Sequence, residues 1–329
     1  PRYLSSAASD VYKRQELYSY LMLYLELFMK LTKRSLLLLI LMGTLFPLTV
    51  FPSDFFSQFE SDGKGEFIFN DWAGVSLRVY STKPEKISND TPIVIILHGQ
   101  SRNAEGYRNS WHDSARDNNF ISLVPKFSTP DFPKTRYNLG NMKTLGGRSI
   151  EREKWIFSAI EPLFEYAREM FGTSVEEYSL FGHSAGAQVA HRFLYFIHPN
   201  RASRTVLANS GYYTMPIEEI SYPYGLKGVK VSEEMLTNAY NKRVIVLLGD
   251  KDNDPKHSSL NTGDQARRQG AHRFARGHNF YMNSLFKGSV LMKVPFNWSM
   301  SIAPGVGHSN RSMVPFATPF LLDGPLKVR

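Results

Sequence analysis

The chain has 329 residues, 42% of them hydrophobic, and contains no cysteine. This length suits one α/β domain with a large core, and the lack of cysteine excludes a disulfide framework, a thiol nucleophile and a cysteine-ligated zinc site. Lys and Arg outnumber Asp and Glu by 39 to 30, a formal charge of +9, but no long basic run occurs, so we expect a well-mixed basic surface and no nucleic-acid partner.

The first 28 residues do not read as part of a folded protein. Residues 1–15, PRYLSSAASDVYKRQ, resemble a translated sequencing adapter of the kind left in assembled metagenomic reads, and we set them aside. Residues 16–28 then read as upstream read-through, which makes Met29 a natural start.

The stretch after Met29 has the order of a secretory signal peptide, a basic segment followed by the apolar run 36–46. No A-x-A cleavage site follows, and no charge occurs from 35 to 53, so an uncleaved membrane anchor stays open, as does a buried N-terminal helix. We expect residues 16–52 to direct export of a bacterial protein to the periplasm or the extracellular space, with membrane contact only through such an anchor.

The rest of the chain, 53–329, alternates apolar runs with helical periodicity. Strands are predicted at 67–69, 75–80, 92–97, 121–124, 177–181, 205–208, 244–248 and 298–302. Helices are predicted at 150–170, 265–286 and 311–322. This alternation predicts an α/β fold with a mostly parallel central sheet and helices on both faces. The segment 212–240 lacks a clean period and is rich in Tyr, Pro and Gly, which suggests a small lid.

A serine stands at the predicted corner between a strand and a helix, in SLFGHSAGAQVA (179–190). So sharp a turn needs small neighbours, and Gly182 and Gly186 flank Ser184 at two residues on either side. The corner lifts the hydroxyl above the sheet edge, at a helix N-terminus whose N–H groups face incoming negative charge. The pattern predicts that Ser184 is a nucleophile; the alternative is a plain serine in a tight turn.

A serine nucleophile needs a base that takes its proton. His308 follows the last predicted strand in APGVGHSN, where Gly305 and Gly307 allow the backbone to carry an imidazole over the sheet edge. We predict His308 as the base and expect packing or surface roles for the other histidines. The His183 side chain, inside the corner, is expected to point away from the direction of the hydroxyl.

The acid that orients the base is predicted in VIVLLGDKDNDP, just past a buried strand. Asp252 has the G-x-x-D spacing from Gly249 and is our first choice, with Asp254 as the alternative acid and Asp250 as a cap of the turn. A calcium loop is excluded, because Pro255 stands where such a loop needs glycine.

Two backbone N–H groups should bind the oxyanion that develops on the substrate. We predict the amide of Ala185, the residue after the nucleophile, and that of Gln100, which follows Gly99 in the loop after strand 92–97, with Ser101 next in line. His98 is expected to hold this loop.

Candidate cleft residues and an arginine cluster complete the site predictions. Ser101, Tyr137, Asn138 and His183 are candidates for the substrate cleft, with an ordinary turn as the alternative for Asn138. Four arginines on the predicted helix 265–286 are interpreted as a solvated face, with an anionic-substrate site as the alternative: Arg267, Arg268, Arg273 and Arg276.

Together these motifs resemble the α/β-hydrolase superfamily, with nucleophile, acid and base in that family's order. The matching residues are LHGQ at 97–100, GHSAG at 182–186, GDKD at 249–252 and GVGH at 305–308. Three longer stretches, PKFSTPDFP…YNLGN, QGAHRFARG and VPFNWSMSIAPGVGHSN, are similar to a bacterial group labelled poly(3-hydroxybutyrate) depolymerase-like. Gln100 departs from the extra glycines of many lipases, which argues against the bulky tertiary-alcohol esters that such a site admits.

The sequence therefore predicts a serine hydrolase that cleaves a small or polymeric carboxylic ester through an acyl-enzyme, without metal or organic cofactor. A peptidase, thioesterase or acyltransferase would use the same three residues, and a non-catalytic binding protein of this fold is the remaining alternative. The identity of the ester and its chain length do not follow from the sequence.

Overall fold

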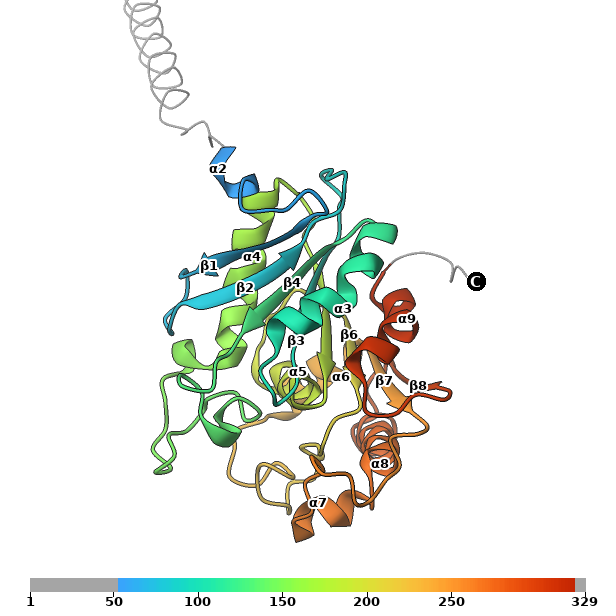
Figure 1. Ribbon diagram of the computed structural model, residues 1–329. Coiled ribbons are helices and arrows are strands. Elements are labelled where there is room, and N and C mark those ends of the chain that lie inside the picture. Colours follow the sequence, from blue (N-terminus) through green and yellow to red (C-terminus); the bar gives the residue numbers. More distant parts are fainter. Residues whose placement is uncertain (1–52, 323–329) are drawn as a thin grey trace, which may run out of the picture. The chain divides into compact units, whose positions relative to one another are not determined.

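A computed structural model describes residues 53–322 (Figure 1). The adapter-like segment, the read-through and the signal peptide or anchor predicted over 1–52 lie outside the described residues. Within the described range, none of the helices combines the length and the apolar character that crossing a bilayer requires.

The described residues form one eight-stranded sheet in the order β1-β2-β4-β3-β5-β6-β7-β8. Its strands are β1 (Lys64–Phe69), β2 (Leu77–Thr82), β3 (Ile93–Leu97), β4 (Ile121–Lys126), β5 (Tyr178–His183), β6 (Ala202–Ala208), β7 (Arg243–Gly249) and β8 (Trp298–Ala303). The pairings β1–β2 and β2–β4 are antiparallel, and all other pairings are parallel. The predicted mostly parallel sheet is confirmed. All five residues of β3 are buried, as a strand covered on both faces requires.

Helices cover both faces of this sheet. The α-helices are α2 (Ser53–Phe56), α3 (Ala104–Asp117), α4 (Ile160–Phe171), α5 (Ala185–Phe196), α6 (Glu233–Asn241), α7 (Asp264–Gln269), α8 (Arg273–Leu285) and α9 (Asn310–Leu321). Short 3₁₀ or π turns are η1 (Lys134–Arg136), η2 (Arg152–Lys154), η3 (Ile156–Ala159) and η4 (Phe286–Met292). Helices α3 and α9 pack on one face around Trp111 and Met313. Helices α4, α5 and α8 pack on the other face around Phe164, Phe193 and Phe280.

The helix predicted over 150–170 begins later than its periodicity indicated. The chain first forms the two short turns η2 and η3, and α4 starts only at Ile160. Pro162 explains the difference, because a proline fits the first turn of a helix but clashes with the preceding turn in a helix interior. A helix starting at 150 would have placed Pro162 in its interior.

The single helix predicted over 265–286 is wrong. The structure has two helices, α7 and α8, separated at Gly270, whose φ of 149° belongs to no helix. His272 begins α8 as its cap, with Nδ1 accepting a hydrogen bond from the Ala275 amide at 3.3 Å. The closing helix is confirmed as α9, with Pro315 and Pro319 inside it.

The segment 212–240, predicted as a small lid, consists of turns followed by α6. It is attached to α5: the Thr214 amide donates to His191 Nε2 at 3.0 Å, and the buried Arg192 donates to Thr214 Oγ1 and to the Pro223 carbonyl. Its role as a lid stays a prediction.

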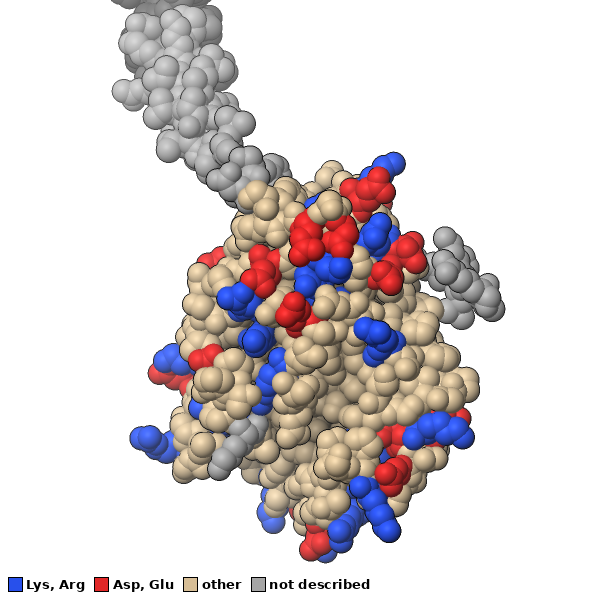
Figure 2. Space-filling view, viewed as in Figure 1, with Lys and Arg blue, Asp and Glu red and all other residues tan. Residues whose placement is uncertain are grey.

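Charged side chains of both signs are interspersed on the face of the molecule in Figure 2. On that face, no single sign dominates over a wide area, which agrees with the well-mixed surface expected from the sequence.

Candidate active site

Ser184 lies at the corner where β5 passes into α5, as the sequence predicted. Its backbone has a positive φ of 58° with a ψ of −115°, a conformation that costs energy in a residue with a side chain. A Cβ at Gly182 would lie 2.4 Å from the Gly186 carbonyl oxygen, and one at Gly186 would lie 2.0 Å from that of Leu97. Both flanking positions therefore require glycine.

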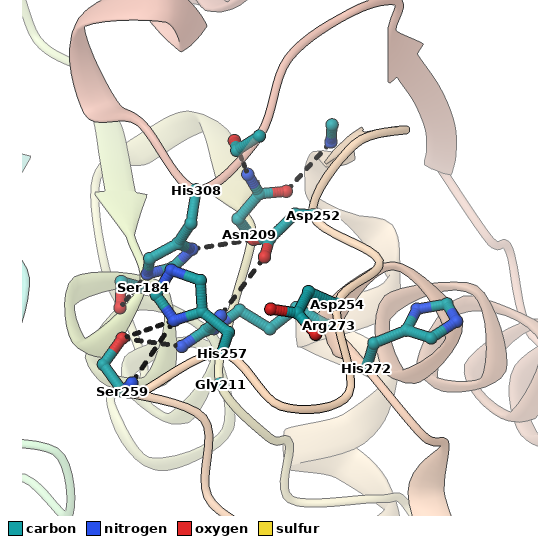
Figure 3. A network of polar contacts seen from close by, with 12 residues as sticks. Ser184, Asn209, Gly211, Asp252, Asp254, His257, Ser259, His272, Arg273 and His308 are labelled. Atoms are coloured by element: carbon teal, nitrogen blue, oxygen red, sulfur yellow. Dashed lines mark hydrogen bonds and ion pairs between the residues drawn. The ribbon is translucent and has the colours of Figure 1, made fainter.

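His308 brings its imidazole to this corner from the loop after β8 (Figure 3). Its Nε2 lies 3.0 Å from Ser184 Oγ, and its Nδ1 lies 2.7 Å from Asp252 Oδ2. In the neutral tautomer that fits these contacts, Nδ1–H donates to the carboxylate and Nε2 accepts from the serine hydroxyl. Three side chains from three separate loops thus form one hydrogen-bonded line.

The two candidate acids lie in different surroundings. Asp252 is 3% exposed and contacts His308, whereas Asp254 is exposed and its Oδ1 accepts from the Lys256 amide at 2.8 Å. Asp250 was predicted to cap the turn after its own strand, but its Oδ1 instead accepts from the Gly305 amide at 2.7 Å and so reaches the loop after β8. The contact to the imidazole belongs to Asp252.

Asn209, which the sequence did not single out, ties the acid loop to the base loop. Its Nδ2 donates to the Gly307 carbonyl at 3.0 Å, and its Oδ1 accepts from the Gly249 amide at 2.9 Å. Asn209 is fully buried and has a positive φ of 46° just after β6. An asparagine directly after a predicted strand was the only signal that could have pointed to it.

Burial lowers the pKa of His308 below its ordinary value, because it disfavours the charged imidazolium. The hydrogen bond and the charge of Asp252 act in the opposite direction, while the charges of Arg273 and His257 lower the His308 pKa further. A neutral imidazole with a free Nε2 lone pair is the form that can take a proton from Ser184.

His183 packs behind His308. Its Nδ1 lies 2.8 Å from the Tyr107 hydroxyl, and the two imidazole rings are 4.8 Å apart between centroids. Burial holds the pKa of His183 well below its ordinary value. Only 3% of His183 is exposed, so its prediction as a cleft residue is corrected: the ring supports the base from inside the fold.

The loop after β3 lies beside the nucleophile. A Cβ at Gly99 would be 3.7 Å from Ser184 Cβ. Within the described residues, the Gln100 amide donates to no backbone carbonyl, and the Ala185 amide opens α5, where a helix leaves its first N–H groups unpaired. Within the described residues, both amides are therefore without a backbone acceptor, and both belong to segments next to Ser184.

The supporting role expected for His98 is confirmed. Its Nδ1–H donates to the Gly99 carbonyl at 2.9 Å, and its Nε2 accepts from the Phe127 amide at 3.1 Å. Burial lowers the pKa of His98 to about 3, which keeps it neutral and in this arrangement.

Two further cleft predictions are corrected by burial. Tyr137 is 0% exposed and donates its hydroxyl to the His98 carbonyl at 2.7 Å, and Asn138 is 5% exposed and donates to Gln188 Oε1 at 3.3 Å. Both residues hold the loop after β3 and α5 in place. Ser101 is exposed, so its prediction as a cleft residue stays open.

The prediction that four arginines form a solvent-exposed face is wrong for two of them. Arg267 and Arg268 are exposed on α7, but Arg273 and Arg276 on α8 are 1% and 0% exposed. The break at Gly270 gives the two helices independent faces, which a continuous helical period does not show.

Among residues 53–322, no three His, Asp or Glu side chains are grouped so that they could hold a metal ion.

A serine at a strand–helix corner, followed along the chain by an aspartate and a histidine on later loops at the same sheet edge, defines the α/β-hydrolase class. Comparison with solved structures agrees. Poly(aspartic acid) hydrolase-1 from Sphingomonas sp. KT-1 is 39% identical over 79% of this chain and 98% of its own, with a TM-score of 0.77. The chain belongs to the α/β-hydrolase superfamily and is a hydrolase.

Two other solved structures are informative. LpqC, a poly(3-hydroxybutyrate) depolymerase from Bordetella parapertussis, is 28% identical over 80% of this chain and 91% of its own, with a TM-score of 0.74. An S-formylglutathione hydrolase from Agrobacterium tumefaciens, 15% identical over 79% of this chain and 94% of its own with a TM-score of 0.51, shares the fold. No family model and no curated protein matches the chain.

Proposed function

We propose that this protein is a serine hydrolase that cleaves acyl bonds through a covalent acyl-enzyme. The observation that carries the proposal is the continuous line of hydrogen bonds from Ser184 Oγ through His308 to Asp252, beside two unpaired backbone amides. Each part of that line matches a requirement of acyl transfer: a nucleophile, a neutral base, an acid that orients the base, and donors for the oxyanion.

The proposed reaction has two halves. Ser184 Oγ attacks the acyl carbon while His308 Nε2 takes the hydroxyl proton, and the amides of Ala185 and Gln100 bind the negative oxygen of the tetrahedral intermediate. His308 then gives the proton to the leaving group, which departs as the acyl-enzyme forms. A water molecule then gives a proton to His308 Nε2 and attacks the acyl carbon. The imidazolium returns this proton to Ser184 Oγ as the bond between the acyl group and serine breaks, which releases the acid and the free serine. Asp252 stabilises the imidazolium in both halves.

We propose a carboxylic ester, in particular a polymeric one, as the substrate. The support is the 28% identical neighbour, which is described as a poly(3-hydroxybutyrate) depolymerase. An amide bond in an acidic polymer is the second candidate, because the 39% identical neighbour is described as a poly(aspartic acid) hydrolase. The same acyl-enzyme serves both, since only the leaving group differs.

The test compares the parent with Ser184→Ala on a short p-nitrophenyl ester. We expect kcat/KM to fall by about 10³-fold or more, the usual effect of removing a member of such a triad. A fluorophosphonate probe should label the parent and not the variant. Equal rates, or equal labelling, would remove Ser184 from the mechanism.

The substrate class is tested separately with the parent alone. Poly(3-hydroxybutyrate), poly(aspartic acid), a thioester and a simple amide are compared by kcat/KM. Release of hydroxy acid from the polyester supports the first candidate, and release of aspartate peptides supports the second. Activity on the thioester alone would contradict both.

A further inference from the structure

The Asp252 carboxylate has a second partner besides His308. Its Oδ2 faces the imidazole, and its Oδ1 accepts from an Nη1–H of Arg273 at 3.2 Å (Figure 3). The side chains of Arg273 and Asp252 are 1% and 2% exposed. The pair is therefore an ion pair closed off from solvent, with one carboxylate oxygen for each partner.

Arg273 is itself held by the loop that follows β7. Its Nη2–H donates to Ser259 Oγ at 2.9 Å, and Ser259 Oγ lies 3.2 Å from His257 Nδ1. The His257 ring approaches the His308 ring edge-on, with 5.4 Å between centroids. From α8, one guanidinium thus joins two points of the loop that follows β7, the Asp252 carboxylate and Ser259.

We propose that Arg273 is a positioning residue of the proposed reaction: it holds the Asp252 carboxylate in the orientation that faces His308, and its buried positive charge opposes the charge of Asp252 beside the imidazole. The inference rests on the proposed function. It gives a role to a residue that the triad does not include.

The geometric half of the role follows from the shape of the guanidinium. Its planar fork reaches two acceptors on the loop after β7, Asp252 and Ser259, and stays charged when buried. A lone carboxylate enclosed at this depth would be costly, and the second partner offsets that cost. The carboxylate cannot rotate without losing one of its two bonds.

The electrostatic half follows from the groups that face His308. Asp252 raises the pKa of His308, whereas Arg273, His257 and burial lower it. The ring of His183 also lies against that of His308 in a tilted arrangement, with 4.8 Å between centroids. Without Arg273, no positive charge would partly cancel the effect of the Asp252 carboxylate on His308. The pKa of His308 would then rise, and activity on the acid side would be lost at a higher pH.

The experiment compares Arg273→Gln with a matched control, Arg276→Gln. Arg276 lies one turn further on α8, is equally buried and donates to the carbonyls of Gly211, Gly270 and Asn261, so it binds backbone and not the acid. The measurements are kcat and KM on a p-nitrophenyl ester, kcat/KM against pH, and the urea midpoint of unfolding.

For Arg273→Gln we expect kcat to fall about tenfold or more with little change in KM, and the acid limb of kcat/KM to move to higher pH. Arg276→Gln should lower the urea midpoint and leave the acid limb in place. If Arg273→Gln leaves the acid limb where the parent has it, the electrostatic role is overturned. If kcat falls no more than in Arg276→Gln, the positioning role is overturned.

Two milder variants keep the inference testable if Arg273→Gln does not fold. Arg273→Lys keeps the charge but not the fork, so the acid limb should stay while kcat falls. The exposed change Ser259→Ala removes the second anchor, so kcat should fall at least about threefold at unchanged KM. A shifted limb in the first variant, or an unchanged kcat in the second, contradicts the proposal. Failure of the proposed function itself would appear as an active Ser184→Ala.

Discussion

At the scale of single residues, two aspartates two positions apart on one loop have opposite surroundings. Asp252 is buried between His308 and Arg273, whereas Asp254 is exposed and caps a turn of its own loop. Only the first can stabilise an imidazolium.

We therefore expect Asp252→Asn to lower kcat by about three to four orders of magnitude, because an amide neither carries the charge nor fixes the tautomer of His308. Asp254→Asn serves as the control and should keep kcat near that of the parent. Steady-state kinetics on one ester decides between them. Comparable losses in the two variants would contradict the assignment.

The residues of the site differ in how far the sequence predicts them. Ser184 and His308 sit in glycine-rich corners whose local pattern is specific, so their roles were predicted from the chain alone. Spacing alone only favours Asp252 over Asp254, and the contact between Asp252 and His308 in the structure supports that choice. Asn209 and Arg273 act through partners about 40 and 20 positions away along the chain, and no local pattern carries such contacts.

At the scale of elements, the corner between β5 and α5 depends on close approach of two backbones. Gly186 has no space for a side chain, since an added Cβ would meet the carbonyl groups of Leu97 and His98. The same carbonyls belong to the strand and loop that carry the Gln100 amide. The packing of α5 against β3, and the position of the Gln100 amide beside it, therefore depend on the absence of a side chain at Gly186.

Gly186→Ala is expected to lower the free energy of unfolding by about 1–3 kcal/mol, the usual cost of overpacking, and to lower kcat by displacing the loop after β3. Gly146→Ala is the matched control, because a Cβ there meets only Thr144 Oγ1 at 3.9 Å. Urea denaturation and ester hydrolysis measure the two effects. A Gly186→Ala variant as stable and active as the Gly146→Ala variant would refute the steric account.

The elements also show where periodicity stops being informative. The apolar runs predicted the strand positions well, because a strand that is buried on both faces consists almost entirely of apolar residues. The helical period across 265–286 continued through Gly270, although the chain there turns away from helical geometry. That break directs Arg273 and Arg276 inward, so missing it also meant missing their burial.

At the scale of the whole molecule, the buried histidines His98, His183 and His191 are held neutral. Burial lowers the pKa of His98 to about 3 and the pKa values of His183 and His191 well below the ordinary value. His98 and His191 each accept a backbone N–H at Nε2, from Phe127 and Thr214. A proton on Nε2 of either ring would point at the backbone N–H and would break the hydrogen bond that this nitrogen accepts.

Because these histidines are neutral in the folded state, we expect the free energy of unfolding to fall in mild acid. A histidine whose pKa is lowered in the folded state takes up its proton only on unfolding, so the free energy of unfolding falls as the pH drops below about 6.5. Each such histidine contributes a loss of about 1.4 kcal/mol per pH unit, down to the pH that equals its pKa in the folded state. Urea unfolding at several pH values between about 6 and 4 measures this slope. His191→Gln, which offers similar hydrogen-bonding groups without a titrating ring, should reduce the slope by about one proton. Parallel slopes for parent and variant would show that His191 is already protonated in the folded protein, contrary to the hydrogen bond it accepts.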